Sequence, residues 1–381
     1  MSFPVSEYQG RLQRAQRRMG AADLDALLLT TEADIRYFTG FLTRFWESPS
    51  RPWFLILPAA GSPVAVIPSI GVALMTRTWI ADIRSWPSPA PGDDGVSLLA
   101  ETLTELLGPK ARVGVPMGPE SHLRMPLADW DRLRALSGLT FTHGARILAD
   151  LRAIKSEAEI SLIRAACAVA DRAFARVPEV ARAGVALSQV FRDFQRLCLE
   201  EGADFVPYLA GAAGPGGYED VISPAGPEPL CRGDVLMLDT GLTQAGYFCD
   251  FDRNFSVAPP SEAVRATHAA LVEAVQEAAA AARPGQTAAG LHRLLTRALG
   301  RHGAPGAGRL GHGLGMQLTE GLSLLPADHT ELRAGMVLTL EPVIELAPGR
   351  IMVHEENIVI REGGAEFLSR PASPDIPVLA G

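Results

Sequence analysis

Four carboxylates and one histidine carry the chemistry that this sequence suggests. Asp239, Asp250, Glu341 and Glu355 lie at the ends of short apolar runs, and His312 lies in a glycine-rich turn. Apolar runs normally exclude charge, because burying an unpaired carboxylate is very costly. The pattern is explained if the five side chains converge and a pair of divalent cations neutralises them. We therefore predict a dinuclear metal site formed by these residues.

The donor set indicates which cations and which reaction to expect. Carboxylate oxygens with a single imidazole nitrogen favour hard or borderline ions, with Mn²⁺ as the leading expectation and Co²⁺, Fe²⁺ or Zn²⁺ as alternatives. Two such ions about 3.5 Å apart can share a bridging hydroxide and polarise a carbonyl oxygen. Glu341 is the best candidate for a general base, because Pro342 follows it and stiffens the exit from its strand.

A hairpin is expected to position the first two acids. Asp239 and Asp250 are eleven positions apart, with Gly241 and Gly246 between them. Glycine allows the positive φ angles that a tight turn demands, so the two flanking segments can pair as antiparallel strands. Both carboxylates can then lie on one side of a sheet.

The other site residues are expected on a strand and in a tight loop. Glu355 should lie on a strand and face the same way as Asn357, because side chains alternate along a strand. Its neighbour His354 should then face away from the metals. His312 stands in GHGLGM (311–316), where three glycines predict tight backbone and a fixed approach for the imidazole.

A chain of 381 residues is too long for one ordinary core, so two domains are expected. We place a smaller α/β domain at 1–150 and the domain with the five site residues at 151–381. A linker with few apolar anchors is expected over 149–155, and Ser156 with Glu159 is the signature of a capping box that begins a helix. In the first domain, helices are expected at 6–20 and 96–108. Strands are expected at 25–30, 53–58, 64–68 and 112–116.

The second domain contains an approximate internal repeat. Several residues of its helical part recur at an offset of 101. The segment RGDVLMLD (232–239) aligns with AGMVLTLE (334–341) at an offset of 102. In both copies an apolar strand ends in an acid, Asp239 or Glu341. The repeat predicts an α+β domain in which two helix–helix–strand–strand units pack about a pseudo-twofold axis.

The repeat also predicts where the acids meet. A second acid follows in the next strand of each copy, Asp250 in the first and Glu355 in the second. Equivalent acids from the two copies should lie near the pseudo-twofold axis. His312 has no partner in the first copy, where the aligned segment is GAAGPGG (211–217).

Composition and charge exclude several classes of protein. The chain is 47% hydrophobic and 20% charged, which is typical of a globular protein, and its net charge of −8 without a basic block disfavours a nucleic-acid partner. No apolar run approaches the ~20 residues of a membrane span, and the N-terminus lacks a signal pattern. The four cysteines have no CxxC spacing, which fits free thiols in a reducing compartment. We expect a cytoplasmic protein with no nucleic-acid or membrane partner.

The motifs resemble those of the pita-bread metalloenzymes, the superfamily of methionine aminopeptidase, aminopeptidase P, prolidase and creatinase. The resemblance covers about 150–370, and the N-terminal domain, with IRYFTGF (35–41), looks like that of creatinase and prolidase. It implies the pita-bread fold, five ligands to two metals, Glu341 as the base and a homodimer. The strings that carry it are LDTGLTQAGYFCDFDRNF (238–255), GHGLGM (311–316), VLTLEP (337–342) and HEENIVI (354–360).

The chain departs from the family pattern at several substrate-handling positions. A histidine that peptidases of this family carry upstream of the first Asp falls here on Ile222 or Ser223. A second histidine, seven residues after the one in the glycine-rich motif, is Thr319. Asp252 stands where the pattern has a hydroxyl near the metals, and Val353 stands where it has an arginine. The predicted metal cage is thus complete, while the residues that would hold a peptide are changed.

Three functions remain open from the sequence. The first is a hydrolase of the Xaa-Pro peptidase type, which cleaves a short peptide at its N-terminal end. The second is a hydrolase of a small non-peptide amide or cyclic amidine, which the absent histidines and Asp252 favour, because lost polar contacts to a peptide would cost about 1–3 kcal/mol each. The third is a binding protein or carbon–sulfur lyase on the same scaffold, although the complete ligand set disfavours a pure binder.

Arg44 and Trp46 form a further candidate. They follow YFTGF (37–41), which is expected to be a strand. In the relatives implied by the resemblance, the N-terminal domain of the neighbouring subunit covers the active site. The segment with Arg44 and Trp46 is a candidate for that role, with an ordinary loop as the alternative.

Overall fold

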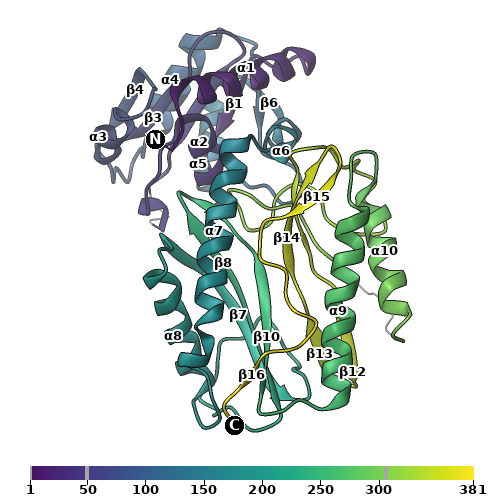
Figure 1. Ribbon diagram of the computed structural model, residues 1–381. Helices are drawn as coiled ribbons and strands as arrows, with labels where there is room; N and C mark the ends of the chain where they lie inside the picture. Colours follow the sequence, from purple (N-terminus) through teal and green to yellow (C-terminus); the bar gives the residue numbers. More distant parts are fainter. Residues whose placement is uncertain (1, 48–50, 304–307) are drawn as a thin grey trace. The chain divides into compact units, whose positions relative to one another are not determined.

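The computed structural model describes residues 2–47, 51–303 and 308–381. The chain divides into two compact units, Met1–Arg152 and Ala153–Gly381 (Figure 1). Within the described residues, no helix is long and apolar enough to cross a membrane.

A six-stranded mixed sheet forms the centre of the N-terminal unit, with strand order β4-β3-β2-β1-β5-β6. The β1–β2 and β2–β3 pairs are antiparallel, whereas β1–β5, β5–β6 and β3–β4 are parallel. Strands β1, β2 and β3 are buried along their whole length, as expected of apolar strands covered on both faces. The elements are α1 (Val5–Ala21), β1 (Ala26–Leu29), α2 (Glu32–Thr39), η1 (Phe45–Glu47), β2 (Phe54–Pro58), β3 (Val64–Pro68), η2 (Ser69–Gly71), α3 (Val72–Met75), β4 (Asp82–Trp86), α4 (Val96–Leu107), β5 (Arg112–Val115), α5 (Leu127–Ser137), β6 (Thr140–His143) and α6 (Ala145–Ala153).

The strand expected at 37–41 is wrong, because most of this stretch belongs to helix α2. The helix begins after Thr31, whose hydroxyl accepts a hydrogen bond from the amide of Asp34, and ends at Gly40 in the left-handed conformation (φ 74°). Threonine before a helix and glycine after it are ordinary capping residues. These caps outweigh the β-forming tendency of the aromatic residues between them.

The linker expected over 149–155 is also wrong, because α6 continues through Ala153. Leu148 and Leu151 are buried in this segment, and their three-residue spacing places both on one helix face. Arg152 is buried as well and forms an ion pair with Asp34, with 3.0 Å between Nη1 and Oδ1. The segment is therefore an ordered helix with apolar contacts.

Three sheets make up the strand part of the C-terminal unit within residues 153–303 and 308–381. The largest has the order β16-β10-β8-β7, with β9 paired to β8; the others are β11-β14-β15 and β12-β13. The elements are α7 (Glu157–Ala175), η3 (Val177–Glu179), α8 (Leu187–Glu200), β7 (Phe205–Pro215), β8 (Asp234–Gln244), β9 (Tyr247–Phe248), β10 (Phe251–Val257), α9 (Glu262–Ala281), α10 (Ala288–Gly300), β11 (Val337–Leu340), β12 (Val343–Ala347), β13 (Arg350–Val353), β14 (Glu356–Arg361), β15 (Gly364–Phe367) and β16 (Val378–Leu379).

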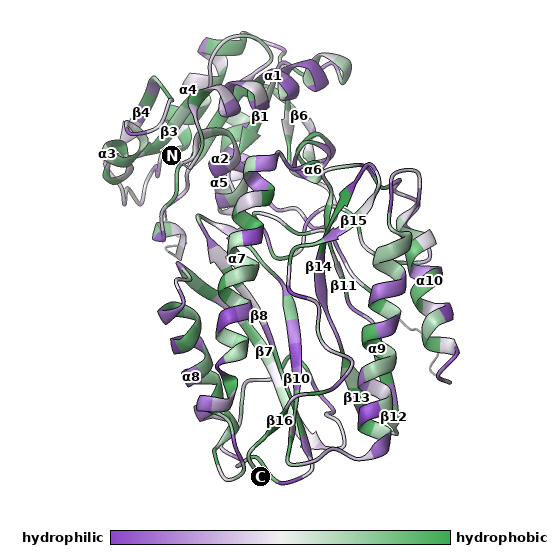
Figure 2. Cartoon of the chain, in the orientation of Figure 1, coloured by the Kyte–Doolittle hydropathy of each residue, from purple (hydrophilic) through white to green (hydrophobic). Residues whose placement is uncertain are grey.

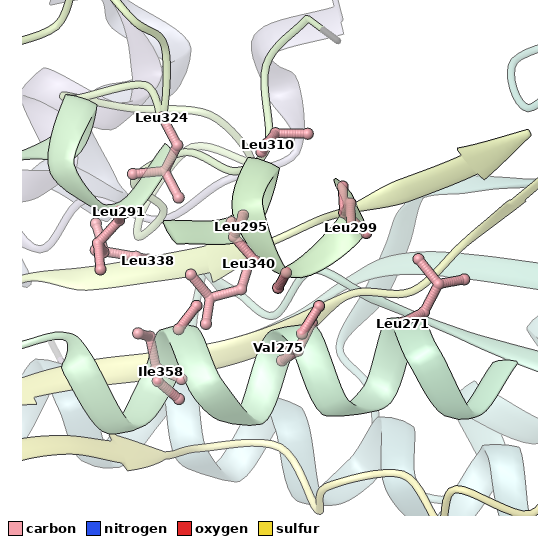
Figure 3. Close-up of a cluster of buried hydrophobic side chains, with 14 of the residues drawn as sticks. Leu271, Val275, Leu291, Leu295, Leu299, Leu310, Leu324, Leu338, Leu340 and Ile358 are labelled. Atoms are coloured by element: carbon pink, nitrogen blue, oxygen red, sulfur yellow. The ribbon is translucent and has the colours of Figure 1, made fainter. Parts of the chain in front are cut away.

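The core of this unit forms where two helices pack on strands of the second repeat. Hydrophobic and hydrophilic residues recur along α9 and α10 (Figure 2), which gives each helix one apolar face. Those faces meet β11 and β14 in a cluster of buried side chains (Figure 3). The cluster includes Leu271, Val275, Leu291, Leu295, Leu299, Leu310, Leu324, Leu338, Leu340 and Ile358.

The internal repeat is visible in the backbone. Gly184 and Gly285, related by the offset of 101, have φ angles of 85° and 86°. Their amides donate equivalent hydrogen bonds, to the carbonyl oxygens of Leu230 and Leu332, at 2.8 and 3.2 Å. Equivalent turns thus join equivalent helices and strands in the two halves.

The capping box predicted at Ser156 is confirmed at the start of α7. The Ser156 hydroxyl accepts from the amide of Glu159, and the Glu159 carboxylate accepts from the amide of Ser156. We expect Ser156→Ala to lower the free energy of unfolding by about 1 kcal/mol, because a helix amide loses its partner. Urea denaturation measures this. Ser161→Ala, at an exposed position inside the same helix, should change the stability little, and equal effects of the two variants would contradict the prediction.

Candidate metal centre

Three buried side chains from distant parts of the C-terminal unit form the centre of the site. The ligand atoms of Asp250, His312 and Glu355 all lie within 4.8 Å of one another. His312 Nε2 is 3.3 Å from Asp250 Oδ2 and 4.0 Å from Glu355 Oε1. The side chains of the three residues are at most 4% exposed. This is the convergence that the sequence predicts for these three residues.

The imidazole of His312 has a defined orientation. Its Nδ1 lies 3.1 Å from the carbonyl oxygen of Gly313. Since a carbonyl only accepts hydrogen bonds, Nδ1 donates to it, and Nε2 is the nitrogen directed at the two carboxylates. That is the form of histidine that binds a metal.

The tight backbone predicted around His312 is present. Gly311 has φ 142°, and a Cβ there would lie 2.3 Å from the carbonyl oxygen of Thr339. A Cβ on Gly313 would lie 2.2 Å from the carbonyl oxygen of Glu320. The His312 amide donates to the Thr339 hydroxyl at 3.1 Å. The loop is therefore held against β11, the strand that directly precedes Glu341.

Asp239 and Glu341 border this centre from equivalent places in the two repeats. Asp239 lies on β8 and Glu341 directly follows β11, and both side chains are partly exposed. Burial raises the pKa of Asp239 well above its usual value, and the nearby charges of Asp250, Asp252 and Glu341 raise it further. The pKa of Glu341 is raised by burial, an effect that His312 and Arg309 oppose. Asp239 and Glu341 thus belong to the same electrostatic cluster as the buried acids.

The carboxylates fit divalent cations. One oxygen of each acid, Asp239 Oδ1, Asp250 Oδ1, Glu341 Oε2 and Glu355 Oε1, is buried without a hydrogen-bond partner among the described residues. Burial raises the pKa values of Asp250 and Glu355 well above the usual range, and neighbouring acids add to the shift. Buried carboxylates that repel one another and lack donors are stabilised by metal ions.

Asn357 holds the Asp250 segment in place. Its side-chain oxygen accepts from the Asp250 amide at 3.0 Å, and its side-chain nitrogen donates to the Asp250 carbonyl oxygen. The hairpin predicted between Asp239 and Asp250 is confirmed, because β8 pairs in antiparallel fashion with β9 and β10. The expectation that Glu355 itself lies on a strand is wrong, because it lies in the connection between β13 and β14.

A second layer of charge lies behind Glu355. Asp252, His354 and Glu356 are each 1% exposed. His354 contacts Asp252 with one nitrogen and Glu356 with the other, at 3.3 and 3.4 Å. These two acids raise the pKa of His354 although its burial opposes the shift. His354 is therefore part of a buried charged chain with these two acids.

Three other predicted positions are not part of the buried group. Thr319 lies partly buried in the loop after His312, and its contact with substrate stays a prediction. Arg44 and Trp46 belong to the N-terminal unit. There Trp46 packs on Trp53, with ring centroids 5.7 Å apart, and its carbonyl oxygen accepts a hydrogen bond from Arg124. Arg44 is exposed on that unit.

Two residues near the acids escaped prediction from sequence. Burial raises the pKa of the hydroxyl of Tyr208, on β7, and the nearby charges of Asp239 and Asp250 raise it further. The charge of Arg309 partly opposes the rise in the pKa values of Asp250 and Glu341. Arg309 stands three residues before His312 in the sequence, a proximity that could have drawn attention to it. Tyr208 comes near the acids only through the pairing of β7 with β8, in which it lies opposite Gly241.

Known proteins match the chain over its whole length. Residues 161–362, more than half of the chain, match the model of metallopeptidase family M24, and residues 11–154 match the creatinase/prolidase N-terminal domain. The chain is 31% identical over 371 residues to the probable dipeptidase PepE of Mycobacterium tuberculosis, an alignment that covers 95% of this chain and 94% of the relative. It is 30% identical over 229 residues to the Xaa-Pro dipeptidase of Pyrococcus furiosus, covering 59% of this chain and 65% of that protein.

Solved structures confirm the predicted fold class. Dipeptidase PepE from Mycobacterium ulcerans has a TM-score of 0.85 and 29% identity, with full coverage of both chains. The prolidase from Thermococcus sibiricus has a TM-score of 0.86 and 23% identity, and covers 98% of this chain and 99% of its own. The α+β pita-bread domain preceded by a creatinase-like N-terminal domain is therefore correct. The chain belongs to metallopeptidase family M24 and is a metallohydrolase.

Proposed function

We propose that this protein is a peptidase that hydrolyses Xaa-Pro bonds at the N-terminal end of short peptides. Asp239, Asp250, His312, Glu341 and Glu355 would hold two divalent cations, with Mn²⁺ ahead of Co²⁺, Zn²⁺ and Fe²⁺. The observation that carries the proposal is the group of buried acids with unpartnered oxygens beside one imidazole nitrogen. The dipeptidases among the relatives support the substrate class.

The residues of the chain have separate tasks in this reaction. Bound cations would supply a Lewis acid and lower the pKa of water. Glu341 is partly exposed, so it can reach both water and substrate. It takes the proton from the attacking water and delivers it to the leaving nitrogen. Tyr208, whose hydroxyl lies near Asp239, would orient that carboxylate.

One observation favours a second substrate class, a small non-peptide amide or amidine. The first histidine of the family's peptidases falls on Ile222 or Ser223 in this chain. Ile222 is 83% exposed, and the Ser223 hydroxyl donates a hydrogen bond to Asp220. Thr319 stands at the second such position. A site without these two imidazoles suits a substrate that needs fewer contacts to a peptide backbone.

A hydrolysis panel separates the two classes. We expect the Mn²⁺-loaded protein to cleave Xaa-Pro dipeptides, with slower turnover of dipeptides that lack proline. Chromatography of the free amino acids that are released measures this turnover. Small amides and cyclic amidines are tested in parallel at the same metal loading. If every peptide stays intact while an amide or amidine is consumed, the second class replaces the first, and binding without any turnover would favour a binding protein or lyase.

We also propose a cytoplasmic homodimer in which the segment of Arg44 and Trp46 covers the site of the neighbouring subunit. The exposed Arg44 side chain supports this, as do the four free cysteines, three of them buried, which suit a reducing compartment. Light scattering measures the mass in solution. A monomeric protein that is fully active would remove the proposed role of this segment.

A further inference from the structure

Asp252, His354 and Glu356 form a continuous buried chain of acid, imidazole and acid beside the metal centre. His354 Nδ1 lies 3.3 Å from Asp252 Oδ1, and His354 Nε2 lies 3.4 Å from Glu356 Oε1. Burial of two carboxylates is costly unless each has a compensating partner. The imidazole between them supplies a shared one.

The Asp252 end of the chain meets the metal centre in two ways. Asp252 Oδ1 accepts a hydrogen bond from the main-chain amide of Glu355 at 2.9 Å. Asp252 also lies opposite Asp239 in the β8–β10 pairing, so the two side chains share a face of the sheet. Asp252 Oδ2 is buried without a hydrogen-bond partner among the described residues.

The Glu356 end is fixed to the C-terminal segment and to Arg253. Glu356 Oε1 accepts from the amide of Ala372 at 2.8 Å, and Oε2 accepts from Arg253 Nη2 at 3.0 Å. Arg253 Nη1 donates to the carbonyl oxygens of Asp252 and Glu355, at 2.6 and 3.3 Å. The main chain of Glu355 is thus held at its amide by Asp252 and at its carbonyl by Arg253.

We propose that Asp252, His354 and Glu356 act together as positioning residues that set the affinity and geometry of the cation held by Glu355. This inference rests on the proposed metal centre and adds residues outside its ligand set. Asp252 fixes the Glu355 backbone and places one further negative charge beside the cage. His354 and Glu356 hold Asp252 in that position.

Co²⁺ binding by the full-length protein tests this, with visible absorption as the readout of ligand geometry and a competing chelator as the readout of affinity. Asp252→Asn and His354→Gln should each weaken Co²⁺ binding by about 10- to 100-fold, the usual effect of losing a residue that supports a ligand. Each should also alter the visible spectrum. The double variant should bind no more weakly than the worse single variant, because residues of one network act non-additively.

Asp234→Asn is the matched control. Asp234 is a buried acid on the same strand as Asp239, and it likewise accepts a main-chain hydrogen bond, from the Cys231 amide at 2.7 Å. It should lower the melting temperature without changing Co²⁺ affinity or spectrum. If Asp252→Asn and His354→Gln bind Co²⁺ as the unaltered protein does, the positioning role is overturned and the metal centre stands. If the unaltered protein binds no Co²⁺, both ideas fail.

Discussion

Glu341→Gln should lower kcat for peptide hydrolysis by about 10²–10⁴-fold, with a much smaller change in KM. Glutamine keeps the shape of the side chain and one ligand oxygen but cannot accept and release the proton. Glu341 directly follows a buried strand and is itself partly exposed. The expected loss of kcat therefore reflects impaired proton transfer more than altered packing.

Steady-state kinetics at a verified metal content measure this effect. Glu345→Gln serves as the control, because Glu345 is an exposed acid four residues away whose carboxylate accepts from the Gly349 amide. It should have nearly unaltered kinetics. If Glu341→Gln kept the kcat of the unaltered protein with the metal bound, the base would have to be another residue.

Removal of metal should lower the melting temperature at pH 7.5 by roughly 5–10 °C. The comparison is with the protein at a Mn²⁺ concentration about 100 times the dissociation constant. The reason is the like charge of the buried acids. Asp239, Asp250 and Glu355 have pKa values raised by burial and by neighbouring acids in the metal-free fold. Cations remove this repulsion in the folded state and bind the unfolded chain weakly.

The same shifts determine how the effect depends on pH. Since the folded pKa of each acid lies above its unfolded value of about 4, the metal-free fold binds more protons than the unfolded chain between the two values. As pH rises through that interval, these acids lower the stability of the metal-free fold. Below the interval they do not lower it. The gap between metal-loaded and metal-free melting temperatures should widen from pH 5 to pH 7.5.

Differential scanning calorimetry across this pH range, with and without chelator, checks the prediction. In Glu355→Gln, which removes one of the buried acids, the gap at pH 7.5 should shrink. A gap that is constant with pH, or equal in this variant, would show that the acids do not form one metal-binding cluster.

Local patterns were sufficient to predict much of the site. The strand that carries Asp239, the hairpin to Asp250 and the tight glycines around His312 each depend on residues close together in sequence. The capping box at Ser156 has the same property. In α2, by contrast, the aromatic residues of YFTGF suggested a strand, and the caps at Thr31 and Gly40 decided for a helix. The expectation that the strand with Asp239 ends at that residue is also wrong, because β8 continues to Gln244.

The sequence by itself determined the types of the five candidate ligands, the repeat that relates Asp239 to Glu341, and the family. Strand alternation and turn glycines act over short distances, the repeat is read by aligning the chain with itself, and the family follows from the resemblance of a few short motifs. Only the tertiary structure decided that Tyr208 lies near Asp239 and that Asp252, His354 and Glu356 form one buried chain. Those contacts join residues up to 102 positions apart, and pairing between distant strands, which no local pattern encodes, brings them together.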